Sequence, residues 1–172
     1  VLFRSLIDLA GTKSKVDWDR SAFEYLVSVS WQKDHNALIT VANRTQTNFQ
    51  TFELINNSLE IKAKHEDAKF IDVIPGQPRF INDDLLTVVD DSQSDTRLIQ
   101  LNSQPLSPNH LQVLGVFGSA KDQIFFSGTS NAIDRDIYQI SKSGKLRQLT
   151  NGGVNSASNV VSTDEATYLV LA

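Results

Sequence analysis

The chain has 172 residues and a formal net charge of −4, and its 16 lysines and arginines are spread along it. This distribution argues against a nucleic-acid partner, which needs a concentrated basic face. The absence of cysteine excludes disulfides, Cys-metal sites and a thiol nucleophile, and no apolar run approaches the length of a membrane span.

Short runs in which apolar and polar residues alternate predict strands along the whole chain. In the first part, a strand is expected at residues 2–9, and a single helical turn fits residues 17–23. Further strands are expected at residues 25–31, 37–42, 51–55 and 59–64, with a polar hairpin tip at residues 43–50 and a turn at residues 56–58.

Residues 124–150 give the clearest signal, because three alternating runs are separated by a polar loop and by a Ser-Gly-Lys turn at residues 143–145. A hairpin of similar size begins at Ala37, Leu85 and Ile124, and an incomplete copy begins at Thr167. A spacing of about 40–50 residues is the size of one four-stranded propeller blade. Another kind of sheet repeat is the alternative.

The sequence therefore predicts an all-β fold: a partial β-propeller of about three four-stranded antiparallel blades with incomplete ends. One propeller domain would contain the end of a blade at residues 1–12, blades at residues 25–76, 77–111 and 112–150, and the start of another at residues 155–172. Both ends of the chain fall within predicted strands, so we interpret it as an internal fragment. Five aromatic residues at strand spacing are expected in the core: Trp31, Phe52, Phe80, Phe125 and Tyr138.

Residues 124–150, with Asp-Ile-Tyr followed by a Gly turn and Leu-Arg-Gln-Leu-Thr, resemble the blades of TolB-type and peptidase propellers. Residues 25–31 (Tyr-Leu-Val-Ser-Val-Ser-Trp), followed by the hairpin at residues 37–54, are more specific. They resemble the N-terminal propeller of the dipeptidyl peptidase IV family, and the order of segments holds over nearly the whole chain.

This resemblance implies a parent serine exopeptidase that removes dipeptides from peptide N-termini. The propeller would gate and position peptide substrates for a C-terminal α/β-hydrolase domain, and the protein would be a homo-oligomer. Exposed sheet edges also favour self-association. The alternative is a TolB-type propeller scaffold that binds a protein or ligand with no peptidase attached, because one fold hosts many functions.

No catalytic residue is expected within these residues. The nearest match to the Gly-x-Ser-x-Gly nucleophile motif surrounds Ser130, but a strand is predicted after it where a helix is required. No histidine follows His110, so a Ser-Asp-His order cannot be completed. The family's Glu-Glu pair, which anchors the substrate amine, is absent and is expected upstream. The acid pairs at residues 83–84 and 90–91 are expected to be solvated turn residues.

Two candidate sites follow from the resemblance. Arg97 matches an arginine that borders the substrate pocket in the family, although Thr96 and Leu98 replace the usual aromatic residue and histidine. The hairpin at residues 37–55 matches an arm that helps to pair two subunits. The arm candidates are Asn43, Arg44, Thr45, Asn48, Phe49 and Gln50. The alternatives are a surface strand residue for Arg97 and an ordinary exposed loop for the arm.

No metal and no cofactor are expected. His35, His65 and His110 are far apart and share no metal-ligand spacing. The acidic clusters at residues 17–19 and 134–136 lack the glycine and terminal glutamate of a calcium-binding loop.

Overall fold

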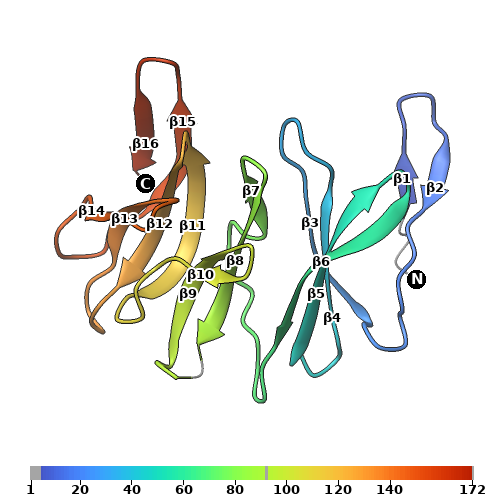
Figure 1. Ribbon diagram of the computed structural model, residues 1–172, viewed down its shortest axis with the longest axis horizontal. Helices are drawn as coiled ribbons and strands as arrows, with labels where there is room; N and C mark the ends of the chain where they lie inside the picture. The colour runs from blue at the N-terminus through green and yellow to red at the C-terminus, as the bar shows by residue number, and fades with distance from the viewer. Residues whose placement is uncertain (1–4, 92, 172) are drawn as a thin grey trace. The chain divides into compact units, whose positions relative to one another are not determined.

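The computed structural model describes residues 5–91 and 93–171, and within these residues the chain forms sixteen strands and no helix (Figure 1). The chain divides into two compact units, Val1–Asp72 and Val73–Ala172. The strands of the first unit are β1 (Ser5–Ile7), β2 (Lys13–Lys15), β3 (Tyr25–Ser30), β4 (Leu38–Ala42), β5 (Asn48–Ile55) and β6 (Ser58–Glu66). The second unit contains β7 (Arg79–Ile81), β8 (Asp84–Asp91), β9 (Thr96–Leu101), β10 (Gln104–Pro105), β11 (Gln112–Ala120), β12 (Gln123–Thr129), β13 (Asp136–Ser141), β14 (Leu146–Gln148), β15 (Ala157–Ser162) and β16 (Thr167–Leu171).

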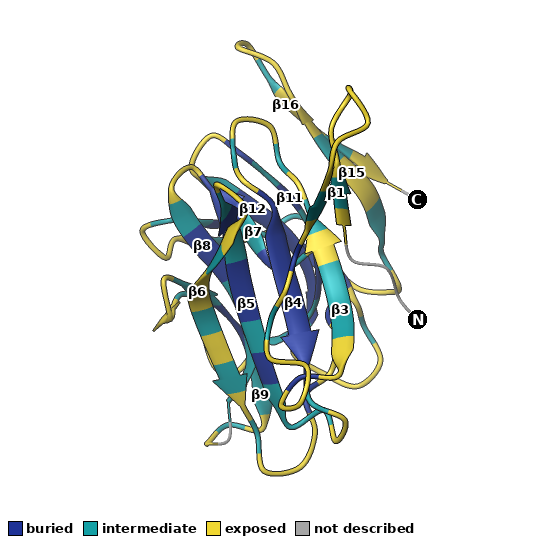
Figure 2. Ribbon diagram, turned by 90° about the vertical axis from the view of Figure 1, so that its right-hand side faces the viewer, coloured by how far each residue is buried: buried dark blue, intermediate teal, exposed yellow. Residues whose placement is uncertain are grey.

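The first unit contains the antiparallel ribbon β1–β2 and the four-stranded sheet β3-β4-β5-β6. Its core is built from apolar side chains of both, namely Val16, Phe23, Ala37, Ile39, Val41, Phe52 and Leu54. β4 is buried at every residue, as its dark colour in Figure 2 shows. Asn56 and Asn57 connect β5 to β6 with φ values of 49° and 63°, which suit the two-residue turn of a tight hairpin.

The second unit contains the four-stranded sheets β10-β9-β8-β7 and β11-β12-β13-β14 and the hairpin β15–β16. Its core includes residues from both four-stranded sheets, so the two sheets fold around one apolar cluster. Phe126 of β12 is fully buried there, and its ring stacks on that of Tyr138 of β13 with 5.6 Å between centroids. An aromatic pair of this geometry adds about 0.5–1.5 kcal/mol to the burial itself.

The predicted fold class is confirmed, because the described residues form three four-stranded antiparallel meanders and two-stranded ends. The predicted single turn is present too: the Phe23 N–H donates to the Asp19 carbonyl at 3.0 Å. The first strand is shorter than predicted, and residues 2–4 of that prediction lie outside the described residues.

Four of the five predicted core aromatics are buried, but the prediction for Trp31 is wrong. Trp31 is 63% exposed, whereas Phe52, Phe80, Phe125 and Tyr138 are each at most 7% exposed. Trp31 follows β3, which is an edge strand of its sheet. Alternation along a strand marks the apolar face, but an edge position leaves part of that face uncovered within the unit.

Candidate functional site

Arg97 lies in β9 directly opposite Asp90 of β8. Its Nε donates to Asp90 Oδ1 at 3.3 Å, and its backbone N–H donates to Gln112 Oε1 at 2.8 Å. The two charged side chains are 23% and 31% exposed. An ion pair in contact with water contributes only about 0–1 kcal/mol to stability. The pair therefore fixes the position of a guanidinium that still reaches the surface.

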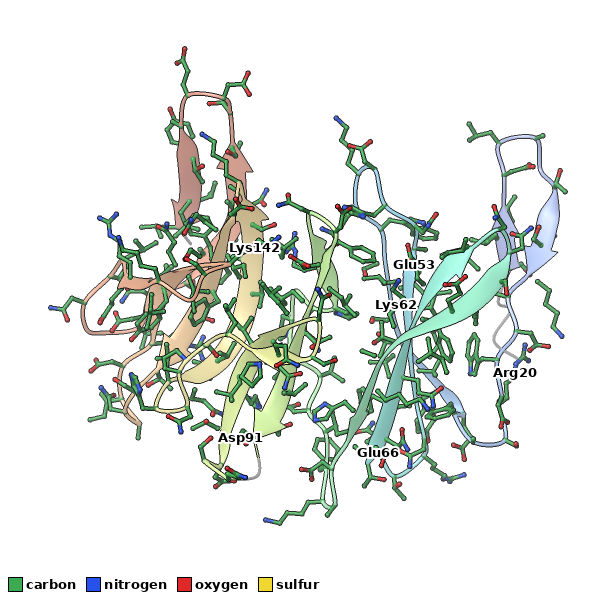
Figure 3. The ribbon with its side chains drawn as sticks, in the orientation of Figure 1. Arg20, Glu53, Lys62, Glu66, Asp91 and Lys142 are labelled. Carbon is green, nitrogen blue, oxygen red and sulfur yellow. The ribbon has the colours of Figure 1, made fainter. Side chains whose placement is uncertain are left out.

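The hairpin end beside Arg97 is closed by side chains of its own loop. Asp91, labelled in Figure 3, accepts hydrogen bonds from the Ser94 hydroxyl and, at 3.2 Å, from the Ser94 N–H. The hydroxyl bond is the main reason that the pKa of Asp91 is lowered below its ordinary value. Thr96 Oγ1 donates to the carbonyl of Asn109 at 2.9 Å. The bond from Thr96 attaches the hairpin end to the segment that leads into β11. Residue 92, in the same loop, lies outside the described residues.

The prediction that the acid pairs are turn residues is wrong for Asp84, Asp90 and Asp91, which are the first and last residues of β8. Asp84 pairs with Lys142, which follows β13, and accepts a hydrogen bond from Asn102 Nδ2 at 2.6 Å. The lysine is the main reason that the pKa of Asp84 is lowered, and the same contact raises the pKa of Lys142. Asp84 therefore links two neighbouring sheets, a role that depends on residues distant in sequence.

The tip of the candidate arm is the turn at residues 43–47 between β4 and β5. Asn43 Oδ1 accepts the Thr47 N–H at 2.9 Å, and the Arg44 N–H donates to Glu24 Oε2 at 2.9 Å. The hydroxyls of Thr45 and Thr47 are 2.9 Å apart. The turn is therefore held by its own side chains and by the residue preceding β3.

The predicted tip was too long, because β5 begins at Asn48 and includes Phe49 and Gln50. Phe49 is 8% exposed and packs in a cluster with Ile71. Asn48 Nδ2 donates to Oε1 of Glu66, which is labelled in Figure 3, at 3.0 Å. Hydrogen bonding along β5 and β6 thus extends closer to the tip than the polar sequence indicated. The pairing role of the arm stays a prediction.

Ser130 lies in the exposed loop between β12 and β13, and a strand follows that loop. The local arrangement is therefore a hairpin and differs from the strand-to-helix elbow that exposes a hydrolase nucleophile. Within the described residues, no group of three or more His, Asp or Glu side chains is placed to hold a metal ion. Those residues also contain no helix with the length and apolarity of a membrane span.

Sequence reasoning missed the contacts of Asp136, which is 5% exposed at the start of β13. Its carboxylate accepts from Thr150 Oγ1 at 2.8 Å, Gln148 Nε2 at 2.9 Å, Asn155 Nδ2 at 3.2 Å and the Gly152 N–H at 3.3 Å. These donors compensate for the cost of burying the carboxylate. Two features of the sequence could have indicated these contacts: an acidic residue at the start of an apolar strand, and the polar residues that follow β14.

Comparison with known proteins agrees with this geometry. The family model described as the dipeptidyl peptidase IV (DPP IV) N-terminal region matches residues 4–171. A search of curated proteins finds no match. Among solved structures, the crystal structure of Porphyromonas gingivalis dipeptidyl peptidase 4 is similar, with a TM-score of 0.71 and 14% sequence identity, over 96% of this chain and 27% of that chain. At this identity the structural likeness bears on the fold, whereas the family model spans nearly all of the sequence: the chain belongs to the dipeptidyl peptidase IV N-terminal region family.

Proposed function

We propose that this chain is the non-catalytic propeller segment of a dipeptidyl-peptidase-IV-like serine exopeptidase. It would gate and position peptide substrates for a C-terminal α/β-hydrolase domain. The observation that carries the proposal is the family match over residues 4–171. The antiparallel four-stranded sheets agree with a propeller wall.

We propose that Arg97 is the residue of the propeller wall that contacts the substrate. Its side chain is 23% exposed and is oriented by Asp90, so the guanidinium can offer N–H donors to a peptide carbonyl or carboxylate. The bond from its own backbone N–H to Gln112 fixes the strand beneath it. An arginine held in this way recognises a substrate group with little loss of side-chain freedom on binding.

We also propose that the turn at residues 43–47 and the adjoining start of β5 contribute to a homo-oligomer contact. Arg44 and Thr45 are the residues of this turn that such a contact would use most directly, while Phe49 packs inside the unit. The mass of the full-length protein in solution, compared with that of an Arg44→Glu, Thr45→Glu double variant, tests this role. An oligomer that is unchanged in the variant contradicts it.

The exopeptidase proposal is tested with the full-length protein and a Gly-Pro or Ala-Pro chromogenic reporter. The full-length protein should release product, and a serine-directed covalent inhibitor should abolish release. The 172-residue chain alone should release none, because Ser130 does not lie on a strand-to-helix elbow and no histidine follows it in the sequence. Turnover by the pure chain would refute the assignment of the chemistry to another domain. A full-length protein that is inert on every dipeptidyl reporter would favour the TolB-type scaffold.

A further inference from the structure

The second unit contains an open cavity of about 340 Å³ beside β11, β12 and β15. Its apolar wall includes Leu114, Val116 and Phe117, and its polar lining residues are Ser127, Arg135 and Ser158. A mainly apolar pocket of this size with a few polar groups is typical of a site for a small ligand. The residues of the candidate site at Arg97 and Asp90 do not line it.

Arg135 brings a positive charge to this cavity that no neighbouring acid balances. Within residues 5–91 and 93–171, no carboxylate forms an ion pair with its guanidinium. The two acids adjacent in sequence are engaged elsewhere: Asp134 accepts the Gly153 N–H at 2.8 Å, and Asp136 accepts four donors. The hydrogen bond that the Gly153 N–H donates to Asp134 also lowers the pKa of Asp134, which favours the anionic form in that contact.

The backbone at Arg135 is fixed, although its side chain has no acidic partner. Its N–H donates to the Gly153 carbonyl at 2.8 Å, and its carbonyl accepts the Asn155 N–H at 2.9 Å. Arg135 is an exposed residue on a fixed backbone, and its guanidinium is suited to a carboxylate because its planar N–H groups match the two oxygens.

Two hydroxyls can complete such a site. Ser127 is 6% exposed, and its Oγ donates to the Gly115 carbonyl across 3.5 Å. Ser158 Oγ donates to the Val170 carbonyl across 3.4 Å. Both bonds are at the long limit for an O–H donor, so little is lost when either proton turns toward a stronger, charged acceptor.

We propose that this cavity binds a small carboxylate that carries an apolar group, of the kind found at the C-terminal residue of a peptide. Arg135 receives the carboxylate, Ser127 and Ser158 donate to it, and the apolar wall of Leu114, Val116 and Phe117 contacts the side chain. Binding at this site does not require a peptidase reaction, so a result that refutes the exopeptidase proposal would not refute this one.

Calorimetric titration of the full-length protein with N-acetyl-leucine and with N-acetyl-leucinamide tests the proposal. The two probes have the same apolar group and differ in the carboxylate. The acid should bind at least about tenfold more tightly than the amide, the difference expected for one charge-assisted hydrogen bond. Arg135→Gln should remove this preference. Arg147→Gln is the matched control, because Arg147 is exposed on β14 of the same sheet and does not line the cavity.

Gly115→Ala gives a second variant that should fold normally. An added Cβ would lie 3.6 Å from Ser127 Oγ and 3.9 Å from the Pro75 carbonyl oxygen, which are ordinary contacts. The methyl group would nevertheless occupy space between lining residues, so the affinity for the acid should fall. Equal affinity for acid and amide, unchanged binding in Arg135→Gln, or no binding of N-acetyl-leucine by the parent protein would each overturn the proposal.

Discussion

Replacing Gly76 by alanine is expected to destabilise the second unit through two separate effects. Gly76 has a φ of 82°, in the left-handed region that disfavours a side chain. An added Cβ would also lie 2.8 Å from the carbonyl carbon of Val116 and would overlap its oxygen. The two segments cannot simply separate, because the Val116 N–H donates to the Pro75 carbonyl at 3.0 Å and the Val116 side chain belongs to the core cluster.

The magnitude follows from these contacts. The left-handed backbone costs a residue with a Cβ about 1–2 kcal/mol. Loss of the Val116–Pro75 hydrogen bond adds about 1 kcal/mol, and displacement of packed side chains adds about 1–3 kcal/mol. Gly76→Ala should therefore lower the free energy of unfolding by about 3–6 kcal/mol. Gly144→Ala is the matched control: its φ is 84°, but nothing lies within 4 Å of an added Cβ, so only the backbone cost of about 1–2 kcal/mol applies.

Urea unfolding followed by far-ultraviolet circular dichroism measures the free energies of unfolding of both variants. Amide hydrogen exchange at Val116 reports the local contact. The Gly76 variant should unfold at lower urea and should lose protection at Val116, while the Gly144 variant keeps that protection. If the two variants lose the same stability, or if Val116 remains protected in both, the steric argument is wrong.

Three further predictions concern individual side chains. Asp136→Ala should lower the free energy of unfolding by about 3 kcal/mol in a urea titration, because four part-buried donors lose a charged acceptor; a change below about 0.5 kcal/mol would contradict this. The pKa of Glu53 is lowered, first by the hydrogen bond from Asn36 and then by Lys62 (Figure 3), so its contribution to stability is present above the ordinary value of 4.5 and is lost as the pH falls through the lower folded value. In Glu53→Gln, the unfolding midpoint should decrease less as the pH is lowered in the acid range. A pH dependence equal to that of the parent protein would refute the assignment. In the full-length protein, Arg97→Ala should raise KM for a dipeptidyl reporter several-fold with little change in kcat, because the residue is proposed to contact substrate away from the reacting bond; a fall in kcat at constant KM would oppose that role.

The strands of the sheet β11–β14 illustrate what can be predicted locally. The three alternating runs within residues 124–150 predicted strands, and the structure places strands there at Gln123–Thr129, Asp136–Ser141 and Leu146–Gln148. A strand has a period of two residues whatever surrounds it, so short segments carry enough information to locate it. The same reasoning placed Ser130 in a hairpin loop, and the repeated hairpin indicated a propeller.

Some site features depended on segments that meet only after folding. Trp31 has the character of a core residue, but its exposure is set by the edge position of the preceding strand. Asp136 is one of several acids in its region, and only the fold brings donors from Thr150 and Asn155 to its carboxylate.

The sequence by itself determined the all-β repeat, the approximate hairpins and the family, because these follow from local periodicity and from residue order. Only the tertiary structure decided that Asp84 links two sheets through Lys142 and that Arg135 lines a cavity with Ser127. Burial and hydrogen bonding depend on which sheet covers which face, and the period of a single strand does not contain that information.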